Sequence, residues 1–389
     1  MADREETMDK GGMSRRQIFG TAFAGAATAA GTAMLGSLGS AAMPGRAFAQ
    51  DAAGGGAPTS IAWGDEAWRK IVADKVAGRT LKIGFTGPAA SEFYDEIEHG
   101  AFAQMRAYSD LFGVKWDWTY ASPQEHQDIN DQVNTIEAWV TNKFDAVLVC
   151  TAGDFESMQN VYARAETAGT RVFQFNMPAE LWDESQNRAI SNIGYNNVMQ
   201  AGYLAGRYIA TKLGGKGKII LIWGLPGHWS TARRKGLDIA LAEFPDLKIV
   251  GEQRGDYVRD KALNAAMNLL QRDPNINAIY GENEEMALGA SQAIQALGLK
   301  PWDGTDGIIT IGADGLKSGF ESIKEGQMTA TVSVGAVDQG RQSIETIFWN
   351  LIFDQVPPKV FNVRTQVVDK TNVDEPLAYV TWALSVPKI

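Results

Sequence analysis

Eight short runs rich in β-branched and aromatic residues recur about every 30 residues, and most of them are followed by a stretch with helical periodicity. The first four runs begin at Leu81, Lys115, Asp145 and Arg171, and the second four begin at Gly217, Leu247, Ala278 and Gly307. A run, its helix and the next run have the size of a βαβ unit. Such alternation implies parallel sheets covered by helices on both faces. The sequence therefore predicts an α/β protein with two doubly wound parallel-sheet lobes.

The first 49 residues have the features of an export signal. Arg15 and Arg16 precede an uncharged run from Gly20 to Met43, and Ala47-Phe48-Ala49 forms a small-x-small cleavage site. About 20 apolar residues can also form a transmembrane anchor. This run is rich in Gly and Ala and ends at a cleavage site, so we expect a twin-arginine signal peptide over 1–49, cleaved after about Ala49. A linker and a short helix are expected over 50–80.

Composition and missing motifs exclude several functions. A net charge of -10 argues against nucleic acid as a partner. A single cysteine, Cys150, excludes an intrachain disulfide, and three scattered histidines disfavour a metal centre. No dinucleotide or phosphate-binding glycine motif stands at a suitable place, and no nucleophile elbow or zinc-protease motif occurs. The carboxylate runs 95–98 and 282–285 are typical of solvated helix starts. We therefore expect no catalytic residues, no cofactor and no metal.

The predicted fold also places the candidate site. Ligands of doubly wound sheets bind beyond the carboxyl ends of the strands, and in a two-lobed protein both sets of strand ends face one cleft. The segments that follow the predicted strands are 87–94, 151–155, 176–177, 224–233, 256–257, 282–284 and Asp314. These segments are the candidates for binding a ligand.

Several of these segments resemble stretches of a known protein family. The stretch 281–290 (GENEEMALGA), followed by 311–315 (IGADG), resembles the sugar-binding type I periplasmic binding proteins, the receptors of ABC importers typified by ribose-binding protein. Further stretches agree in order, namely 93–94, 191–204, 230–236, 253–263 and 325–332. The resemblance covers 81–369. It implies a monomeric periplasmic protein that binds a neutral monosaccharide or sugar alcohol and delivers it to an ABC transporter permease in the inner membrane.

The resemblance also implies a set of ligand-binding residues. They are Phe93, Tyr94, Asn176, Arg233, Tyr257, Asn283 and Asp314. Aromatic rings from both lobes would stack on the apolar faces of a sugar. The arginine would donate in a fork, the asparagines would donate or accept, and the aspartate would accept from hydroxyl groups.

Two positions depart from the pattern of ribose-binding members. Met177 stands where those members have an arginine, and Val334 where they have a glutamine. Sugar hydroxyls buried without these partners would cost about 1–3 kcal/mol each. The departures argue against ribose and favour a polyol, a deoxy sugar or a differently oriented pentose. Trp182 and Trp229 are candidate walls that compensate for the lost contacts.

Members of this family work by closure of two lobes. The resemblance implies a first lobe of 81–188 plus 335–356 and a second of 189–334 plus 357–369. The chain would then cross a three-segment hinge near Ile190, Val334 and Val356, leaving a C-terminal tail of 370–389. Alternatives are a ligand-sensing receptor of the same fold for an autoinducer or a sugar, a repressor effector domain, and an exported sugar-active enzyme. A signal peptide in place of a DNA-binding segment disfavours the repressor, and the missing catalytic motifs disfavour the enzyme.

Overall fold

The computed structural model describes residues 66–178, 186–195 and 198–389. The expected signal peptide, its cleavage site, residues 50–65 of the linker and Trp182 lie outside the described residues. Helix α4 (Glu66–Val76) occupies the end of the segment in which a short helix is predicted. None of the helices in the described ranges is long and apolar enough to cross a membrane.

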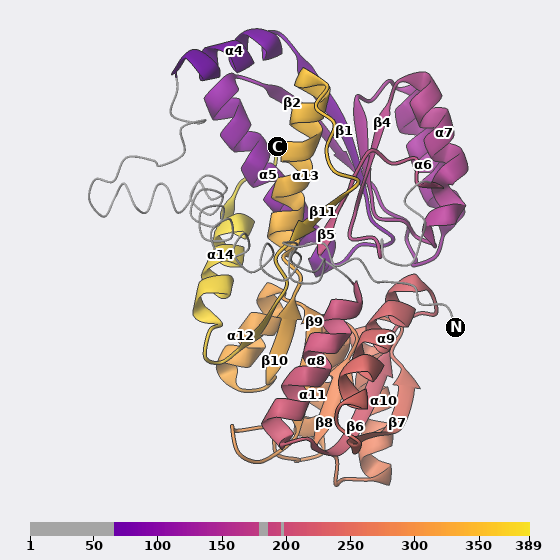
Figure 1. Cartoon of the computed structure of the whole chain (residues 1–389), viewed down its shortest axis with the longest axis vertical. Coiled ribbons are helices and arrows are strands. Elements are labelled where there is room, and N and C mark those ends of the chain that lie inside the picture. The colour runs from indigo at the N-terminus through magenta and orange to yellow at the C-terminus, as the bar shows by residue number, and fades with distance from the viewer. Residues whose placement is uncertain (1–65, 179–185, 196–197) are drawn as a thin grey trace, which may run out of the picture. The chain divides into compact units, whose positions relative to one another are not determined.

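Two six-stranded sheets carry the fold (Figure 1). The first contains β1 (Thr80–Thr86), β2 (Lys115–Tyr120), β3 (Ala146–Val149), β4 (Arg171–Phe175), β5 (Asn192–Tyr195) and β11 (Val360–Val363), in the order β11-β5-β4-β3-β1-β2. The second contains β6 (Lys216–Trp223), β7 (Asp246–Arg254), β8 (Ala278–Gly281), β9 (Ile309–Asp314), β10 (Ala330–Ser333) and β12 (Gln366–Asp369), in the order β12-β10-β9-β8-β6-β7. The described strands pair in parallel, except that β12 is antiparallel to β10. The predicted α/β class with two parallel-sheet lobes is confirmed.

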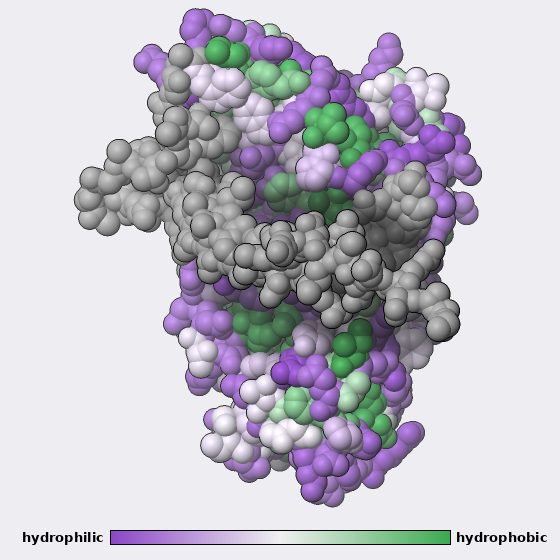
Figure 2. All heavy atoms as spheres, in the orientation of Figure 1, coloured by the Kyte–Doolittle hydropathy of each residue, from purple (hydrophilic) through white to green (hydrophobic). Residues whose placement is uncertain are grey.

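Helices flank both sheets, and we call each sheet with its helices a lobe. The first lobe has α5 (Glu92–Phe112), α6 (Ile129–Thr141), the 3-10 turn η1 (Phe155–Met158), α7 (Gln159–Ala168) and α13 (Ala336–Phe353). The second has α8 (Val198–Leu213), α9 (His228–Ala242), α10 (Arg259–Arg272), α11 (Glu284–Ala296) and α12 (Lys317–Glu325). Apolar side chains of α6 and α7 pack on Val147 and Val149 of β3, and those of α10 and α11 pack on Ile220 and Ile279. The face drawn in Figure 2 is mostly hydrophilic, as expected for apolar cores buried beneath helices.

Strand pairing differs from the expected lobe boundaries at β5 and β11. Residues 189–334 and 357–369 were expected in the second lobe, yet β5 and β11 pair with each other, and β5 also with β4, in the first sheet. The chain therefore passes to the second lobe after β5, returns between β10 and α13, and passes again between β11 and β12. The first and third crossings lie a few residues beyond the expected Ile190 and Val356, because each short strand first completes the first sheet.

Helices α8 and α9 cross at glycines. A Cβ atom on Gly202 would lie 1.9 Å from the carbonyl oxygen of Arg233, and one on Gly236 would lie 1.8 Å from the carbonyl oxygen of Met199. No side chain fits at either position, so the two backbones are in direct contact. This close crossing fixes α9 and with it the Arg233 side chain.

The C-terminal helix α14 (Asp374–Ser385) contacts both lobes. Near its start, Val373 packs in a cluster with Phe320 and Ile323 of α12 in the second lobe. Beyond its end, Val386 packs on α5 and α13 of the first lobe, and Arg106 of α5 donates 2.7 Å hydrogen bonds to the carbonyl oxygens of residues 387 and 388. The segment expected as a tail is thus a packed helix that joins the lobes.

Candidate ligand-binding site

A cavity of about 430 Å³ lies between the lobes at the carboxyl ends of the parallel strands. Its wall comes from segments that follow β1, β2, β3 and β4 in the first lobe and β6, β7, β8 and β9 in the second. The lining includes all seven residues proposed from the sequence: Phe93, Tyr94, Asn176, Arg233, Tyr257, Asn283 and Asp314. The fold thus brings these residues together, and their contact with a ligand stays a prediction.

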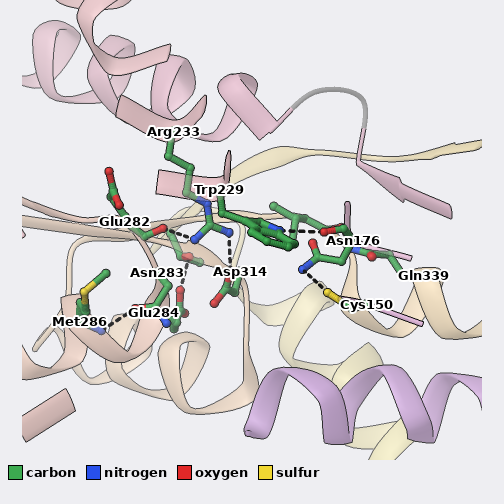
Figure 3. Close-up of polar contacts among 12 residues, drawn as sticks. Cys150, Asn176, Trp229, Arg233, Glu282, Asn283, Glu284, Met286, Asp314 and Gln339 are labelled. Carbon is green, nitrogen blue, oxygen red and sulfur yellow. Dashed lines mark hydrogen bonds and ion pairs between the residues drawn. The ribbon is translucent and has the colours of Figure 1, made fainter. Parts of the chain in front are cut away.

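An ion pair between Arg233 and Asp314 lies in the wall of the cavity (Figure 3). The Arg233 Nη2 atom donates to Asp314 Oδ1 at 3.1 Å, and Nη1 donates to the carbonyl oxygen of Glu282. The two side chains are only 5% and 7% exposed. Burial raises the pKa of Asp314 to about 6, although the Arg233 charge and a backbone hydrogen bond from Glu284 act in the opposite direction. At neutral pH the opposite charges of this pair offset each other.

Asn283 has a structural role as well as a place in the wall. Its Oδ1 atom accepts a 3.0 Å hydrogen bond from the backbone N–H of Met286 and so caps the start of α11 (Figure 3). The cap fixes the orientation of the side chain. Its Nδ2 amide group is therefore the donor that Asn283 can offer to a ligand.

Four of the six carboxylates in the two runs expected at solvated helix starts are buried instead. Glu96, Glu98, Glu282 and Glu284 are each at most 3% exposed. Glu282 Oε2 accepts from the Gly224 N–H at 2.8 Å and from the Ser230 hydroxyl at 2.5 Å, and burial raises the pKa of Glu282 to about 7. Glu284 accepts from the Thr331 hydroxyl, and burial raises its pKa to about 8. The predicted solvation is wrong for these four, which face the inside of the molecule, whereas Asp95 is exposed and Glu285 is partly exposed.

Aromatic rings line the cavity from both lobes. Phe93 lies edge-on to Tyr94, with ring centroids 5.3 Å apart, and the Tyr94 hydroxyl lies 3.7 Å from the Cys150 sulfur. Tyr257 follows β7 in a left-handed conformation with φ of 62°. Its ring lies against Gly224, where a Cβ atom would be 2.0 Å from the Tyr257 Cζ atom. The absence of a side chain at Gly224 therefore determines where the Tyr257 ring lies.

Asn176 and Trp229 connect the lobes at the cavity. The Trp229 Nε1 atom of α9 donates to the carbonyl oxygen of Asn176 at 2.9 Å (Figure 3). The Asn176 Oδ1 atom is buried and has no hydrogen-bond partner among the described residues. Asn176 and Asp314 both have positive φ angles, of 52° and 132°. Such backbone strain is common at binding sites, and the open Oδ1 atom is able to accept a hydrogen bond.

The two departures from the ribose-binding pattern do not reach the cavity surface. Met177 and Val334 are 3% and 0% exposed, and neither belongs to the described lining residues. The Met177 sulfur instead accepts from the backbone N–H of Thr151 at 3.4 Å. The expected loss of two polar ligand partners therefore does not follow from these side chains.

Two further lining residues, Glu92 and Asp154, lie in the candidate segments 87–94 and 151–155 but outside the set of seven, and they form hydrogen bonds between the lobes. Glu92 accepts from the backbone N–H and the hydroxyl of Ser318, at 2.9 and 2.6 Å. Asp154 accepts from the His228 N–H at 3.2 Å. In the sequence, the feature that indicates these residues is their position after a predicted strand or at the start of a helix.

Among the described residues no group of three or more His, Cys, Asp or Glu side chains is arranged to hold a metal ion.

Comparisons with known proteins agree with this fold and site. The family model for the periplasmic binding protein domain matches residues 83–351. The chain is 27% identical over 254 residues to a xylitol-binding protein of Mycolicibacterium smegmatis, covering 65% of this chain and 67% of that one. It is 30% identical over 238 residues to the D-allose-binding periplasmic protein of Escherichia coli, covering 60% and 73%. This chain belongs to the periplasmic binding protein family.

Solved structures of other binding proteins also resemble this chain. An ABC transporter periplasmic solute binding protein from Actinobacillus succinogenes with bound D-allose has a TM-score of 0.67 and 26% identity, covering 76% of this chain and 99% of that one. A solute binding protein from Mycobacterium smegmatis with bound glycerol has a TM-score of 0.64 and 28% identity, covering 76% and 96%. The resemblance to type I sugar-binding members is thereby confirmed. The family consists of substrate-binding proteins rather than enzymes.

Proposed function

We propose that this protein is the periplasmic substrate-binding component of an ABC importer and binds a neutral monosaccharide or a sugar alcohol in the interlobe cavity. The buried Arg233–Asp314 pair carries the proposal. This pair neutralises itself, and the other carboxylates of the lining have partners within the protein: Glu92 accepts from Ser318, Asp154 from the His228 N–H and Glu285 from Arg259. The cavity therefore does not call for a charged ligand. Rings at Phe93 and Tyr257 suit apolar faces, and the ion pair with the two asparagines suits a hydroxylated rim.

The volume and the relatives narrow the ligand class. A cavity of about 430 Å³ falls in the range of about 300–1,000 Å³ that is typical of small-molecule sites. Similar proteins are named for xylitol and D-allose, a sugar alcohol and a hexose. Because Met177 and Val334 lie behind the wall, the cavity gives no reason to restrict the ligand to a pentose.

Titration calorimetry tests this proposal. We expect at least one of xylitol, D-allose, D-ribose and D-apiose to bind with a Kd on the order of micromolar or tighter. D-glucuronate and L-leucine should bind at least about 100-fold more weakly, because a buried charge without a partner costs several kcal/mol. Tight binding of the amino acid or the sugar acid, with no binding of the neutral compounds, contradicts the proposal.

The proposed route to the periplasm is the twin-arginine pathway, with cleavage after about Ala49. Replacing Arg15 and Arg16 together with lysine should leave an uncleaved cytoplasmic precursor, because this signal is read by a receptor rather than by charge alone. Immunoblots of cell fractions measure the outcome. Normal processing of the double variant would show that another route exports the protein.

Delivery of the bound ligand for import requires a membrane partner. Ligand contacts from both lobes stabilise the closed state, and a permease in the inner membrane would recognise that state. We expect the binding protein itself to be a monomer.

A further inference from the structure

Two glutamates of one lobe hold the start of a helix of the other. Glu92 and Glu96 lie one turn apart on α5 in the first lobe. Glu92 accepts both polar hydrogens of Ser318, and Glu96 Oε1 accepts the backbone N–H of Lys317 at 2.7 Å. Lys317 and Ser318 form the first turn of α12 in the second lobe. We call these four residues the α5–α12 clasp, and it exists only while the lobes are together.

Glu96 is the buried member of the clasp. It is 0% exposed, and its Oε2 atom has no hydrogen-bond partner among the described residues. The Lys317 ammonium is partly exposed and pairs instead with Glu321 at 2.6 Å. No cation among the described residues is recorded as an ion-pair partner of Glu96. The Lys317 charge is near enough to act on Glu96, but it is partly exposed and pairs directly with Glu321, so the buried carboxyl has no direct ion-pair partner among the described residues.

Carboxyl groups on three elements interact electrostatically with Glu96. Glu92 lies on its own helix, Glu284 comes from α11 and Asp314 comes from β9, where Arg233 of α9 neutralises it. Burial is the main cause that raises the pKa of Glu96 well above its usual value, and these three carboxyls raise it further. The backbone hydrogen bond from Lys317 lowers it.

We infer that Glu96 takes up a proton when the lobes close over a ligand, so that ligand binding is coupled to proton uptake. The inference rests on the proposed function, because a ligand drives the closure. When the lobes separate, water replaces Lys317 at the Glu96 carboxyl, and the ionised form is favoured. When they close, an ionised and unpaired carboxylate is costly, whereas the neutral acid still accepts through Oε1.

The direction of the pH dependence follows from this linkage. The closed state binds the proton more tightly than the open state does. Affinity is therefore constant below the open-state pKa of Glu96 and falls as the pH rises toward its closed-state pKa. One coupled proton changes the affinity by up to about tenfold per pH unit in that interval.

Calorimetry of the full mature chain tests the coupling. Xylitol, D-allose and D-ribose are titrated in phosphate and in Tris, whose ionisation enthalpies differ, so the difference in heat gives the protons taken up per bound ligand. We expect the wild type to take up protons on binding at pH values above the usual glutamate pKa of 4.5, and we expect its affinity to fall as the pH rises above that value. Glu96→Gln should take up fewer protons and show a flatter pH profile, because the glutamine cannot titrate.

Glu98→Gln is the matched control. Glu98 lies on the same helix and is also buried, but it accepts from Trp118 Nε1 at 2.8 Å within the first lobe. This variant should keep the proton uptake of the wild type. If Glu96→Gln does not fold, Glu96→Ala replaces it, because alanine also removes the titrating group.

The outcomes separate the two proposals. Tight binding by the wild type with no proton uptake contradicts the coupling alone. Equal uptake by the wild type and the Glu96 variant also contradicts it, since another group then takes the proton. Absence of binding by all three compounds contradicts the proposed function and removes the basis of the coupling with it.

Discussion

Replacing Asp314 with alanine is expected to weaken ligand binding by about 2–4 kcal/mol, or about 30- to 700-fold in Kd. The carboxylate is buried, pairs with Arg233 and lines the cavity. Its removal leaves ligand hydroxyls without an acceptor and the buried guanidinium without its counter-charge. Calorimetry with the compound that binds the wild type most tightly measures the loss.

Asp303→Ala is the control for this variant. Asp303 lies in the loop before β9, at the end of the strand opposite to Asp314, and its side chain is 47% exposed beside Lys300. The Asp303→Ala variant should bind the ligand as tightly as the wild type does. A change of less than about threefold in the Asp314 variant, with its thermal unfolding intact, would show that this carboxylate does not contact the ligand.

Thermal stability is expected to fall as the pH rises from 5 to 8.5, and Glu284→Gln should remove much of that fall. Burial raises the pKa of Glu284 from its usual 4.5 to about 8 in the folded protein. The folded state therefore binds the proton more tightly than the unfolded state, so the stabilisation is complete below pH 4.5 and is lost as the pH approaches 8. At about 1.4 kcal/mol per pKa unit, the wild type should lose about 4 kcal/mol through this group between pH 5 and 8.5.

Unfolding midpoints measured across this pH range test the expectation. The glutamine variant should be more stable than the wild type at pH 8.5, and the difference should shrink toward pH 5. Glu243→Gln, at an exposed residue paired with Arg207, should follow the wild-type curve. Parallel curves for the Glu284 variant and the wild type would mean that Glu284 does not titrate in this range.

The cavity wall was largely accessible from the sequence because a simple rule locates it. Parallel strands that alternate with helices place their carboxyl ends on one edge, and residues after those ends line the cavity. Phe93 after β1, Tyr257 after β7 and Asp314 at the end of β9 all follow this rule.

What the sequence did not reveal depends on contacts between segments distant in the chain. Strands β5 and β11 are four residues each, too short to specify a partner, and the tertiary fold places them in the first sheet. Glu96 looks like a solvated helix-start acid until α12 covers it. Met177 follows a strand as Asn176 does, yet its side chain points to Thr151 behind the wall. The strand-end rule identifies positions but not the direction of each side chain.

The helix at the C-terminus limits how the hinge can move. With 12 residues, α14 is a rod about 18 Å long at 1.5 Å per residue, and it cannot stretch without losing backbone hydrogen bonds. Buried side chains along the helix, from Val373 to Ala383, pack in one cluster with Phe320 and Ile323, and the residues beyond its C-terminal end bind Arg106. A rotation that parts the lobes must keep these two anchor points a fixed distance apart or expose apolar surface at one of them. The rod therefore removes directions of motion that three chain crossings alone would leave free.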